Sequence, residues 1–373
     1  NDYHTDRNSG LLSEFYKELK EYILNEIFKD GDLLSEEFGE SFTNDEVRQS
    51  LNSDYIVNKK YLDDKNYSDI RVKALLALSS IQIIFSNIHF PKRDSRDIFD
   101  YLKILNLFGQ IHFDYSEFYL SSLDLKGTEL FFQDCTFHRR WSLQDYKVLE
   151  NVDDVIYQTC IFKDEVSNYS PDENKKYYKI KSNQFDYTCK FEKSLNLRNV
   201  KFDGLLFSTA QGNYLEEKLK IKEIKIEDSI FNSKVIINRF KIDNFIVKNT
   251  IFQNKFEFKE NDIKLFDIDN SNFKKLTDFY ASKFEEFRVF KSILDDFVGF
   301  EKCEFGSKNI IDEKYIANFT YATFLNFINF RNTTFYSGLN IENTNLKESP
   351  NFLKSSIESK HTNRETIRVI KHS

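Results

Sequence analysis

The second half of the chain repeats itself every 21 residues, and this period limits the folds open to it. Large apolar residues return in four columns, and each column advances by 21 residues from one member to the next. The columns are Ile226, Val247, Ile268, Val289 and Ile310; Phe231, Phe252, Phe273 and Leu294; Ile237, Phe258, Phe279 and Phe300; and Ile242, Ile263, Phe284 and Phe305. Such a period is typical of a solenoid, in which each unit covers the apolar face of the next.

Within one repeat the apolar residues are 5, 6, 5 and 5 positions apart, as in Val247, Phe252, Phe258, Ile263 and Ile268. An amphipathic helix would place apolar residues three or four positions apart, and a half-buried strand would alternate them. The observed spacing fits neither element. It predicts a chain that turns a corner after each inward residue, with four corners closing one coil.

A small residue stands two positions before each member of the second column, at Ser229, Thr250, Ser271 and Ser292. The same small, polar, large order recurs in Ser282-Lys283-Phe284, Cys303-Glu304-Phe305, Ala322-Thr323-Phe324, Thr333-Thr334-Phe335 and Thr344-Asn345-Leu346. These triplets resemble the A(D/N)LXX motif of the bacterial pentapeptide-repeat family, in a degenerate and Phe-rich form. The resemblance implies a right-handed, four-sided parallel β-helix, and the extra residue in each 21-residue coil implies a bulged corner.

The same register predicts a solenoid over residues 111–352, interrupted by loops near 163–185, 208–225 and 306–316. Residues 1–110 are predicted to form an α-helical capping domain, with a partner-binding acidic helix as the alternative. Amphipathic helices are expected over 11–28 and from Asp94 through Leu107, and Ala74 to Phe85 is interpreted as a buried helix. With 20 acidic and 14 basic residues, this segment carries most of the net charge of −7. Residues 353–373 are a basic tail or the start of a helix.

All four cysteines precede a phenylalanine by two positions, at Cys135, Cys160, Cys189 and Cys303. They occupy the slot held elsewhere by Ser, Thr or Ala, so we expect small buried side chains in a reducing compartment. A zinc site or a disulfide is disfavoured because no CxxC pair is present. No apolar run is long enough to cross a membrane, and no secretory signal is visible, so a cytoplasmic location is expected. If the protein continues past Ser373 into a membrane-associated region, it would lie at the cytoplasmic face of a membrane.

The sequence predicts no catalytic, cofactor-binding or metal-binding residues. The six His form no HExxH, and the ten Gly form no nucleotide-binding or nucleophile-elbow motif. The one conspicuous cluster, His138-Arg139-Arg140-Trp141, is interpreted as a solvent-facing turn that holds most of its members. The acidic pairs Glu285-Glu286 and Asp295-Asp296 could suggest glycosidase chemistry, but they stand at outward repeat positions, where solubility accounts for charge.

These observations favour a non-enzymatic scaffold or protein-interaction module, with an unidentified protein as its partner. The alternative is a DNA-mimicking regulator of a type II topoisomerase, which some members of the resembled family are. A DNA mimic needs dense negative charge, whereas residues 226–352 hold 19 acidic and 17 basic residues. A polysaccharide-active β-helix enzyme is less favoured, and so is direct nucleic-acid binding. Because residues 353–373 are too few to cover a coil, self-association through the C-terminal end of the solenoid is also expected.

Overall fold

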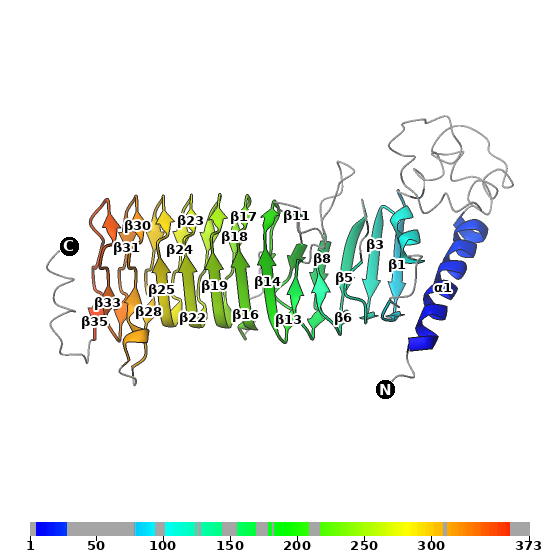
Figure 1. The fold of residues 1–373 in the computed structure, drawn as a ribbon, viewed down its shortest axis with the longest axis horizontal. Coiled ribbons are helices and arrows are strands. Elements are labelled where there is room, and N and C mark those ends of the chain that lie inside the picture. Colours follow the sequence, from blue (N-terminus) through cyan, green and yellow to red (C-terminus); the bar gives the residue numbers. More distant parts are fainter. Residues whose placement is uncertain are drawn as a thin grey trace, which may run out of the picture. The chain divides into compact units, whose positions relative to one another are not determined.

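The computed structural model describes residues 5–27, 78, 80–93, 101–123, 125, 128–143, 155–168, 178–180, 183–208, 217–308 and 312–358. The described residues are mainly β structure, arranged in several parallel sheets (Figure 1). Contacts divide the chain into two compact units, which are residues 1–139 with 144–156, and residues 140–143 with 157–373.

In the first unit, helix α1 (Thr5–Tyr22) continues into the π-helical turn η1 (Ile23–Ile27), so the helix predicted over residues 11–28 is present. The helix buries Leu12, Leu19 and Ile23, which recur at helical spacing. The Phe15 ring lies 5.7 Å from the ring of Phe85 and 5.8 Å from the ring of Phe90. The helix therefore covers apolar side chains of the first strands that follow it.

Those strands form two short parallel stacks. The first contains β1 (Gln82–Ser86), β3 (Gln110–Asp114) and β5 (Glu129–Gln133). The second contains β2 (His89–Phe90), β4 (Glu117–Phe118) and β6 (Thr136–Phe137). Parallel pairing therefore begins before Ile111, within the segment that the sequence analysis assigned to the cap.

The buried helix expected over Ala74 to Phe85 is wrong for its last residues. Ile83, Ile84 and Phe85 lie in β1, and Ile83 pairs with Ile111. β-Branched and aromatic residues favour a strand when a partner strand is available, and β3 supplies that partner. The second predicted helix is represented by the 3₁₀ helix η4 (Tyr101–Leu107), whereas residues 94–100 lie outside the described residues.

The second unit contains three long parallel sheets. The first sheet contains β7 (Trp141–Ser142), β10 (Val166–Ser167), β14 (Ser194–Arg198), β16 (Leu219–Glu227), β19 (Phe240–Lys248), β22 (Asp262–Asp269), β25 (Lys283–Phe290), β28 (Glu304–Phe305), β29 (Ala317–Asn318), β32 (Thr334–Phe335), β33 (Leu339–Asn340) and β35 (Ser356–Ile357). The second contains β11 (Tyr178–Ile180), β15 (Val200–Phe202), β17 (Ile230–Phe231), β20 (Ile251–Phe252), β23 (Asn272–Phe273), β26 (Ile293–Leu294), β30 (Thr323–Phe324) and β34 (Asn345–Leu346).

The third sheet contains β18 (Val235–Ile236), β21 (Phe256–Glu257), β24 (Thr277–Asp278), β27 (Val298–Gly299) and β31 (Ile328–Asn329). The remaining short elements are β8 (Val155–Gln158), β9 (Ile161–Phe162), β12 (Asn183–Phe185), β13 (Lys190–Phe191) and the 3₁₀ turn η5 (Glu313–Tyr315). Each central repeat contributes one strand to each long sheet, whereas the later repeats contribute two short strands to the first sheet, as with β32 and β33. Figure 1 shows successive strands such as β16, β19, β22 and β25 side by side. This arrangement is consistent with a parallel β-helix.

In the central repeats, each residue pairs with the residue one repeat away in the neighbouring strand, as the columns predict. Phe252 pairs with Phe231 on one side and with Phe273 on the other, and Phe273 pairs with Leu294. In the fourth column, Ile263 lies between Ile242 and Phe284. The members of these two columns are at most 3% exposed, so each is covered by the coils on both sides.

The first column ends differently from the prediction. Ile226, Val247, Ile268 and Val289 stack in register, but Ile310 lies outside the described residues. Arg288 pairs with Asn318, so Phe319 rather than Ile310 follows Val289. The cause is the insertion at residues 306–316, which lengthens this turn of the repeat so that Leu294 pairs with Phe324.

A further buried column was missed by the sequence analysis. The rings of Phe245, Phe266 and Phe287 stack 5.2 and 5.0 Å apart, two positions before the first column. The position two residues before an inward residue is therefore small along the second face but large along the first. The core is packed as densely as an organic crystal, so it needs residues of different sizes. A large residue at this position on every face would not fit.

Two corners of each central repeat turn through a residue with positive φ. At one corner φ lies between 46° and 50°, at Asp228, Asn249, Asn270 and Lys291. At the other it lies between 55° and 63°, at Arg239, Glu260, Ala281 and Lys302. Asn and Asp tolerate this conformation, whereas other residues with a Cβ pay a steric penalty. The coil therefore makes its sharp turns with few glycines.

We predict that Phe273→Asp unfolds the neighbouring coils. Phe273 is 1% exposed between Phe252 and Leu294, so the new carboxylate would be buried without a partner. Removal of a buried Phe alone costs about 3 to 5 kcal/mol. Denaturant unfolding should show at least this loss. The matched control is Gln253→Asp, because Gln253 is exposed one residue after Phe252. Similar losses in the two variants would contradict the buried column.

We also predict opposite effects of two Ala→Gly substitutions. Ala281 has φ of 55°, and relief of its left-handed strain should raise the free energy of unfolding by roughly 1 kcal/mol. Ala322 is fully buried and is not among the residues with positive φ, so Ala322→Gly removes a packed methyl group and lowers the free energy of unfolding. Thermal and denaturant unfolding measure both changes. Destabilisation by Ala281→Gly would show that its backbone is not strained.

Candidate interaction surface

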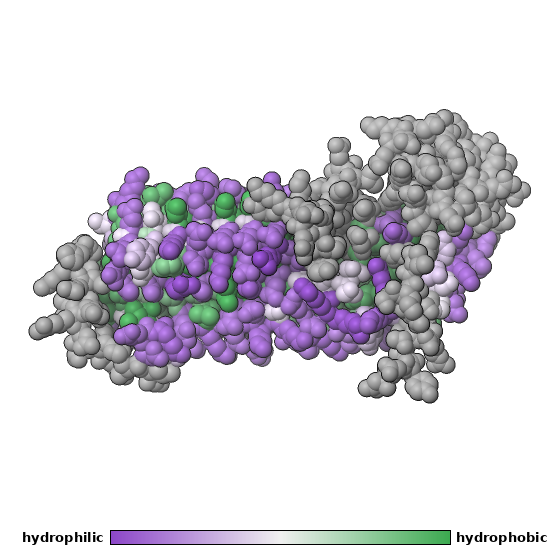
Figure 2. All heavy atoms as spheres, in the orientation of Figure 1, coloured by the Kyte–Doolittle hydropathy of each residue, from purple (hydrophilic) through white to green (hydrophobic). Residues whose placement is uncertain are grey.

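The outer face of the first long sheet carries charged rows that run across the strands. One row consists of Lys220, Lys241, Asp262, Lys283 and Glu304, which are in-register neighbours from β16 to β28. Two residues further along the same strands stand Lys222, Asp243, Lys264 and Glu285. Beyond the first lysines, the charges alternate in sign along both rows. Figure 2 shows a largely hydrophilic face with scattered hydrophobic side chains.

The alternating charges bind one another between neighbouring coils. The Nζ of Lys283 lies 3.0 Å from Glu304 Oε1, and the Nζ of Lys264 lies 2.6 Å from Asp243 Oδ1. Arg288 donates two hydrogen bonds to Asp267, of 2.6 and 2.9 Å. The hydrogen bond to Glu304 raises the pKa of Lys283, and the hydrogen bonds to Asp267 raise the pKa of Arg288. Exposed pairs of this kind contribute about 0 to 1 kcal/mol each, so their main effect is on register.

A similar charge cluster lies on the outer side of the third sheet. Glu257 and Asp278 are in-register neighbours of like charge. Lys259 Nζ lies 3.5 Å from Glu257 Oε2 and 3.0 Å from Asp278 Oδ2. Burial alone would raise the pKa of Glu257, but the hydrogen bond from Lys255 and the charge of Lys259 hold that pKa below its usual range. Here the protein neutralises a like-charge pair with a lysine placed between its members.

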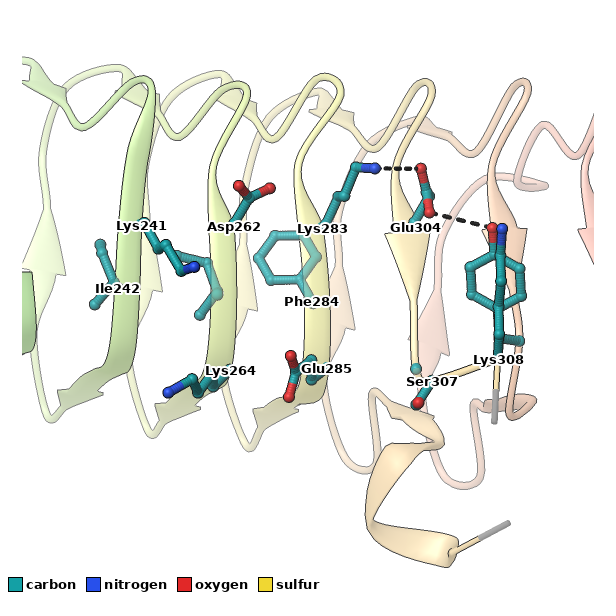
Figure 3. Close-up of a pocket in the computed structure, with 13 residues that line it drawn as sticks. Lys241, Ile242, Asp262, Lys264, Lys283, Phe284, Glu285, Glu304, Ser307 and Lys308 are labelled. Carbon is teal, nitrogen blue, oxygen red and sulfur yellow. Dashed lines mark hydrogen bonds and ion pairs between the residues drawn. The ribbon is translucent and has the colours of Figure 1, made fainter. Parts of the chain in front are cut away.

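The charged rows border a groove of about 490 Å³. Figure 3 shows Lys241, Asp262, Lys283 and Glu304 along one side, and Lys264, Glu285 and Ser307 along the other. Lys308 and Tyr336 also line it. The groove therefore offers both signs of charge, together with hydroxyl groups.

Hydrogen bonds fix the wall of the groove beside Tyr336. Its hydroxyl donates to Glu304 Oε2 at 3.1 Å, and Lys308 Nζ lies 4.8 Å from the centre of its ring. The interaction with the Tyr336 hydroxyl raises the pKa of Lys308. These contacts join neighbouring coils and leave Glu304 shared between Lys283 and Tyr336.

Gly306 makes the turn at which the insertion leaves the sheet. Its φ is 84°, and a Cβ at this position would lie 2.7 Å from Ser337 Oγ and 2.8 Å from the Tyr315 carbonyl oxygen. Only glycine fits both the conformation and the space. The strand β28 consequently ends at Phe305, and the chain moves away from the sheet beside the groove.

The cluster His138-Arg139-Arg140-Trp141 does not form one site. Trp141 is fully buried in β7, and its Nε1 donates a 2.8 Å hydrogen bond to the hydroxyl of Tyr157. Arg140 lies 3.1 Å from Glu165 and also donates to Ser167, and Arg139 is exposed. The expected solvent-facing turn thus holds for the arginines, while the tryptophan is part of the core.

His138 belongs to a cluster that the sequence analysis missed. Its Nε2 lies 3.4 Å from Glu117 Oε2, and His89 Nε2 lies 3.5 Å from the same oxygen. Tyr119 donates to this oxygen at 3.3 Å, and its ring stacks on His138 at 4.2 Å. Burial and the charge of Glu117 raise the pKa of Tyr119. Residues so far apart in sequence meet because they occupy outward positions of successive coils, which only the register reveals.

The acidic pairs noted in the sequence are distributed over structural contacts. Glu285 lines the groove, and Glu286 lies 3.2 Å from Lys314. Asp295 lies 2.9 Å from Lys274, and Asp296 accepts a hydrogen bond from the backbone of Phe297. Across the described ranges, no three His, Cys, Asp or Glu side chains are placed to hold a metal ion. None of the helices in the described part of the chain is long and apolar enough to cross a membrane.

All four cysteines are free and buried, as predicted. Their thiols replace the hydroxyl groups found at equivalent positions. Cys303 donates to the Phe279 carbonyl oxygen at 3.0 Å, as Ser282 donates to Phe258 and Thr333 to Phe300. Burial raises the pKa of the Cys303 thiol.

Comparisons with known proteins identify no relative. No protein-family model, no curated protein and no solved structure matches the chain.

We predict that the four cysteines resist alkylation in the native protein. Each is at most 1% exposed, and the raised pKa of Cys303 leaves this residue with little reactive thiolate at neutral pH. Mass spectrometry after iodoacetamide treatment should find modification only in denatured protein. Cys303→Ser should remain folded, because its hydroxyl can donate to the same carbonyl group. Fast native labelling would contradict the buried placement.

Proposed function

We propose that this protein is a non-enzymatic scaffold that binds a protein partner along the outer faces of a β-helix. In this proposal the repeats form a right-handed, four-sided helix of the pentapeptide-repeat type, with about 21 residues per coil. The parallel, in-register stacks support this architecture. The proposed location is the cytoplasm, including the cytoplasmic face of a membrane.

The observation that carries the proposal is the regular outer face of the first long sheet. Its side chains are held in rows by backbone pairing, with strands about 4.8 Å apart. A surface fixed in this way loses little conformational entropy when a partner binds. The groove with both signs of charge gives such a partner a defined position.

The alternative of a DNA-mimicking regulator receives less support. A mimic of duplex DNA would present negative charge without compensation. Here Asp243, Asp262 and Glu304 of the outer rows are each paired with a lysine, and Asp267 is paired with Arg288. A polysaccharide-active enzyme would need carboxylates free to exchange protons, whereas Glu304 is held by both Lys283 and Tyr336.

A crosslinking experiment tests the scaffold proposal. The full chain is used to isolate its partner from the cells that make it, and the complex is treated with a lysine-reactive crosslinker. We expect crosslinks from outward lysines of the first long sheet, such as Lys264 and Lys283, to the partner. Crosslinks confined to other faces would contradict the proposed surface. Release of reducing sugars from polysaccharides by the purified chain would contradict the non-enzymatic assignment.

We also propose self-association through the C-terminal end of the stack. Phe319, Phe324, Phe330 and Phe335 are at most 2% exposed. In the following coil the equivalent inward residues Ile341, Leu346, Phe352 and Ile357 are only partly buried. An incompletely covered coil favours association with a second copy.

We predict that Leu353→Glu weakens this association by about tenfold, which corresponds to about 1.4 kcal/mol. Leu353 is 56% exposed beside Phe352, so the substitution should not unfold the chain. Sedimentation velocity over a range of concentrations measures the effect. The matched control is Tyr321→Glu, since Tyr321 is 52% exposed on an earlier coil. A wild-type chain that stays monomeric at high concentration would remove the basis for this proposal.

A further inference from the structure

The alternation of charge on the first long sheet breaks down at one end of the groove. Lys220 of β16 and Lys241 of β19 are in-register neighbours, so two residues of like charge stand side by side on adjacent strands. Lys222 lies two residues after Lys220 on the same outer face. All three lysines are exposed, and Lys241 also lines the groove. Like charges directly opposite one another destabilise a sheet, so this arrangement needs an explanation.

The nearby carboxylates are already bound to other groups. Asp262, the in-register neighbour of Lys241, lies 2.8 Å from Lys218. Asp243 lies 2.6 Å from Lys264. Among the described residues, no carboxylate lies within 4.0 Å of the ammonium groups of Lys222 and Lys241.

Lys220 has one weak partner, because Glu217 lies 3.9 Å away and both side chains are more than 70% exposed. The like-charge pair on the third sheet differs from this one. There the like pair of Glu257 and Asp278 has Lys259 between its two carboxylates. The pair of Lys220 and Lys241 has no such counter-charge from the described chain.

We infer that Lys220, Lys222 and Lys241 form a docking site for an acidic, extended segment of a partner protein. From this site the segment continues into the groove. Carboxylates of the segment would supply the missing negative charge. Further along the groove, Lys264 and Glu285 can meet side chains of either sign, and Ser307 can meet polar ones. This inference rests on the proposed scaffold function and specifies the chemistry of the partner.

Charge density favours a peptide over a nucleic acid. Duplex DNA carries one negative charge per about 1.7 Å of its axis, so it would bring phosphates close to Asp243, Asp262 and Glu285 as well. A peptide can place carboxylates only at the lysine cluster and neutral residues elsewhere. The small number of lysines and the acidic groups around them therefore fit a short acidic cluster better than a uniform polyanion.

The test is direct binding of a fluorescein-labelled peptide that contains a run of glutamates flanked by serine and glycine. Fluorescence anisotropy with the full chain should show binding that weakens as salt is added, since screening reduces attraction between exposed charges. The triple variant K220E/K222E/K241E should bind the peptide at least about tenfold more weakly. Its circular dichroism should match the wild type, because all three side chains are exposed.

The matched control is K234E/K275E/K347E, which changes the net charge equally at three exposed lysines away from the cluster. Unchanged peptide binding by this control supports the site, and an equal loss would show only a net-charge effect. Absence of binding by the wild type at low salt, or tighter binding of heparin or single-stranded DNA than of the peptide, would overturn the inference. The assay uses no cellular partner, so its failure is distinguishable from failure of the scaffold proposal.

A second measurement does not depend on any ligand. The single variant Lys220→Glu places opposite charges in register at residue 220 and Lys241, and Lys241 keeps Asp262 as its other in-register neighbour, so the unfolding midpoint should rise above that of the wild type. Such a rise would show that the wild-type lysine pair is retained at a cost in stability. A fall in the midpoint would indicate that the pair is already neutralised, and this would count against the docking site.

Discussion

The mutual covering of stacked apolar side chains is the interaction on which the rest of this structure depends. Phe252 is buried because Phe231 and Phe273 lie on either side of it, and no coil could bury its own inward residues alone. Backbone pairing and side-chain stacking therefore share one register. A repeat can change in length and keep this register, since Leu294 still pairs with Phe324 across the longer repeat that includes residues 306–316.

That constraint also shapes the polar parts of the molecule. The hydroxyl and thiol groups that precede inward residues donate to backbone carbonyls. Ser282 and Cys303 donate to the previous coil, whereas Ser271 donates to the carbonyl two residues before it. Each such group is buried, and its hydrogen bond offsets the cost of removing it from water. On the outer surface, the same register brings charged residues from successive coils together. The ion pairs between coils are consequences of the repeat. Positions where the charges do not alternate therefore indicate a candidate binding site.

The candidate surface illustrates this point. Glu304 is held by Lys283 and Tyr336, so it contributes to the wall of the groove and to the stacking of coils at the same time. Lys220 and Lys241 stand in the same kind of row, but as neighbours of like charge. A surface whose charges are otherwise matched directs a partner to the place where they are not matched. In the proposed scaffold, such a local mismatch of charge would be a physical basis for specificity.

The 21-residue spacing by itself determined the stacked columns, because inward positions recur at fixed intervals along the chain, and the Cys-x-Phe pattern predicted the burial of the cysteines. It could not reveal the column of Phe245, Phe266 and Phe287, since a large residue before a large residue does not follow the motif. It also predicted Ile310 as the neighbour of Val289. The pairing of Arg288 with Asn318 makes Phe319 that neighbour, because the insertion changes the spacing. The strand at Gln82–Ser86, the meeting of His89 with Glu117 and His138, and the facing lysines were decided by tertiary structure. Those features depend on which strand lies beside which, and pairing between distant segments is set by the register of the whole stack.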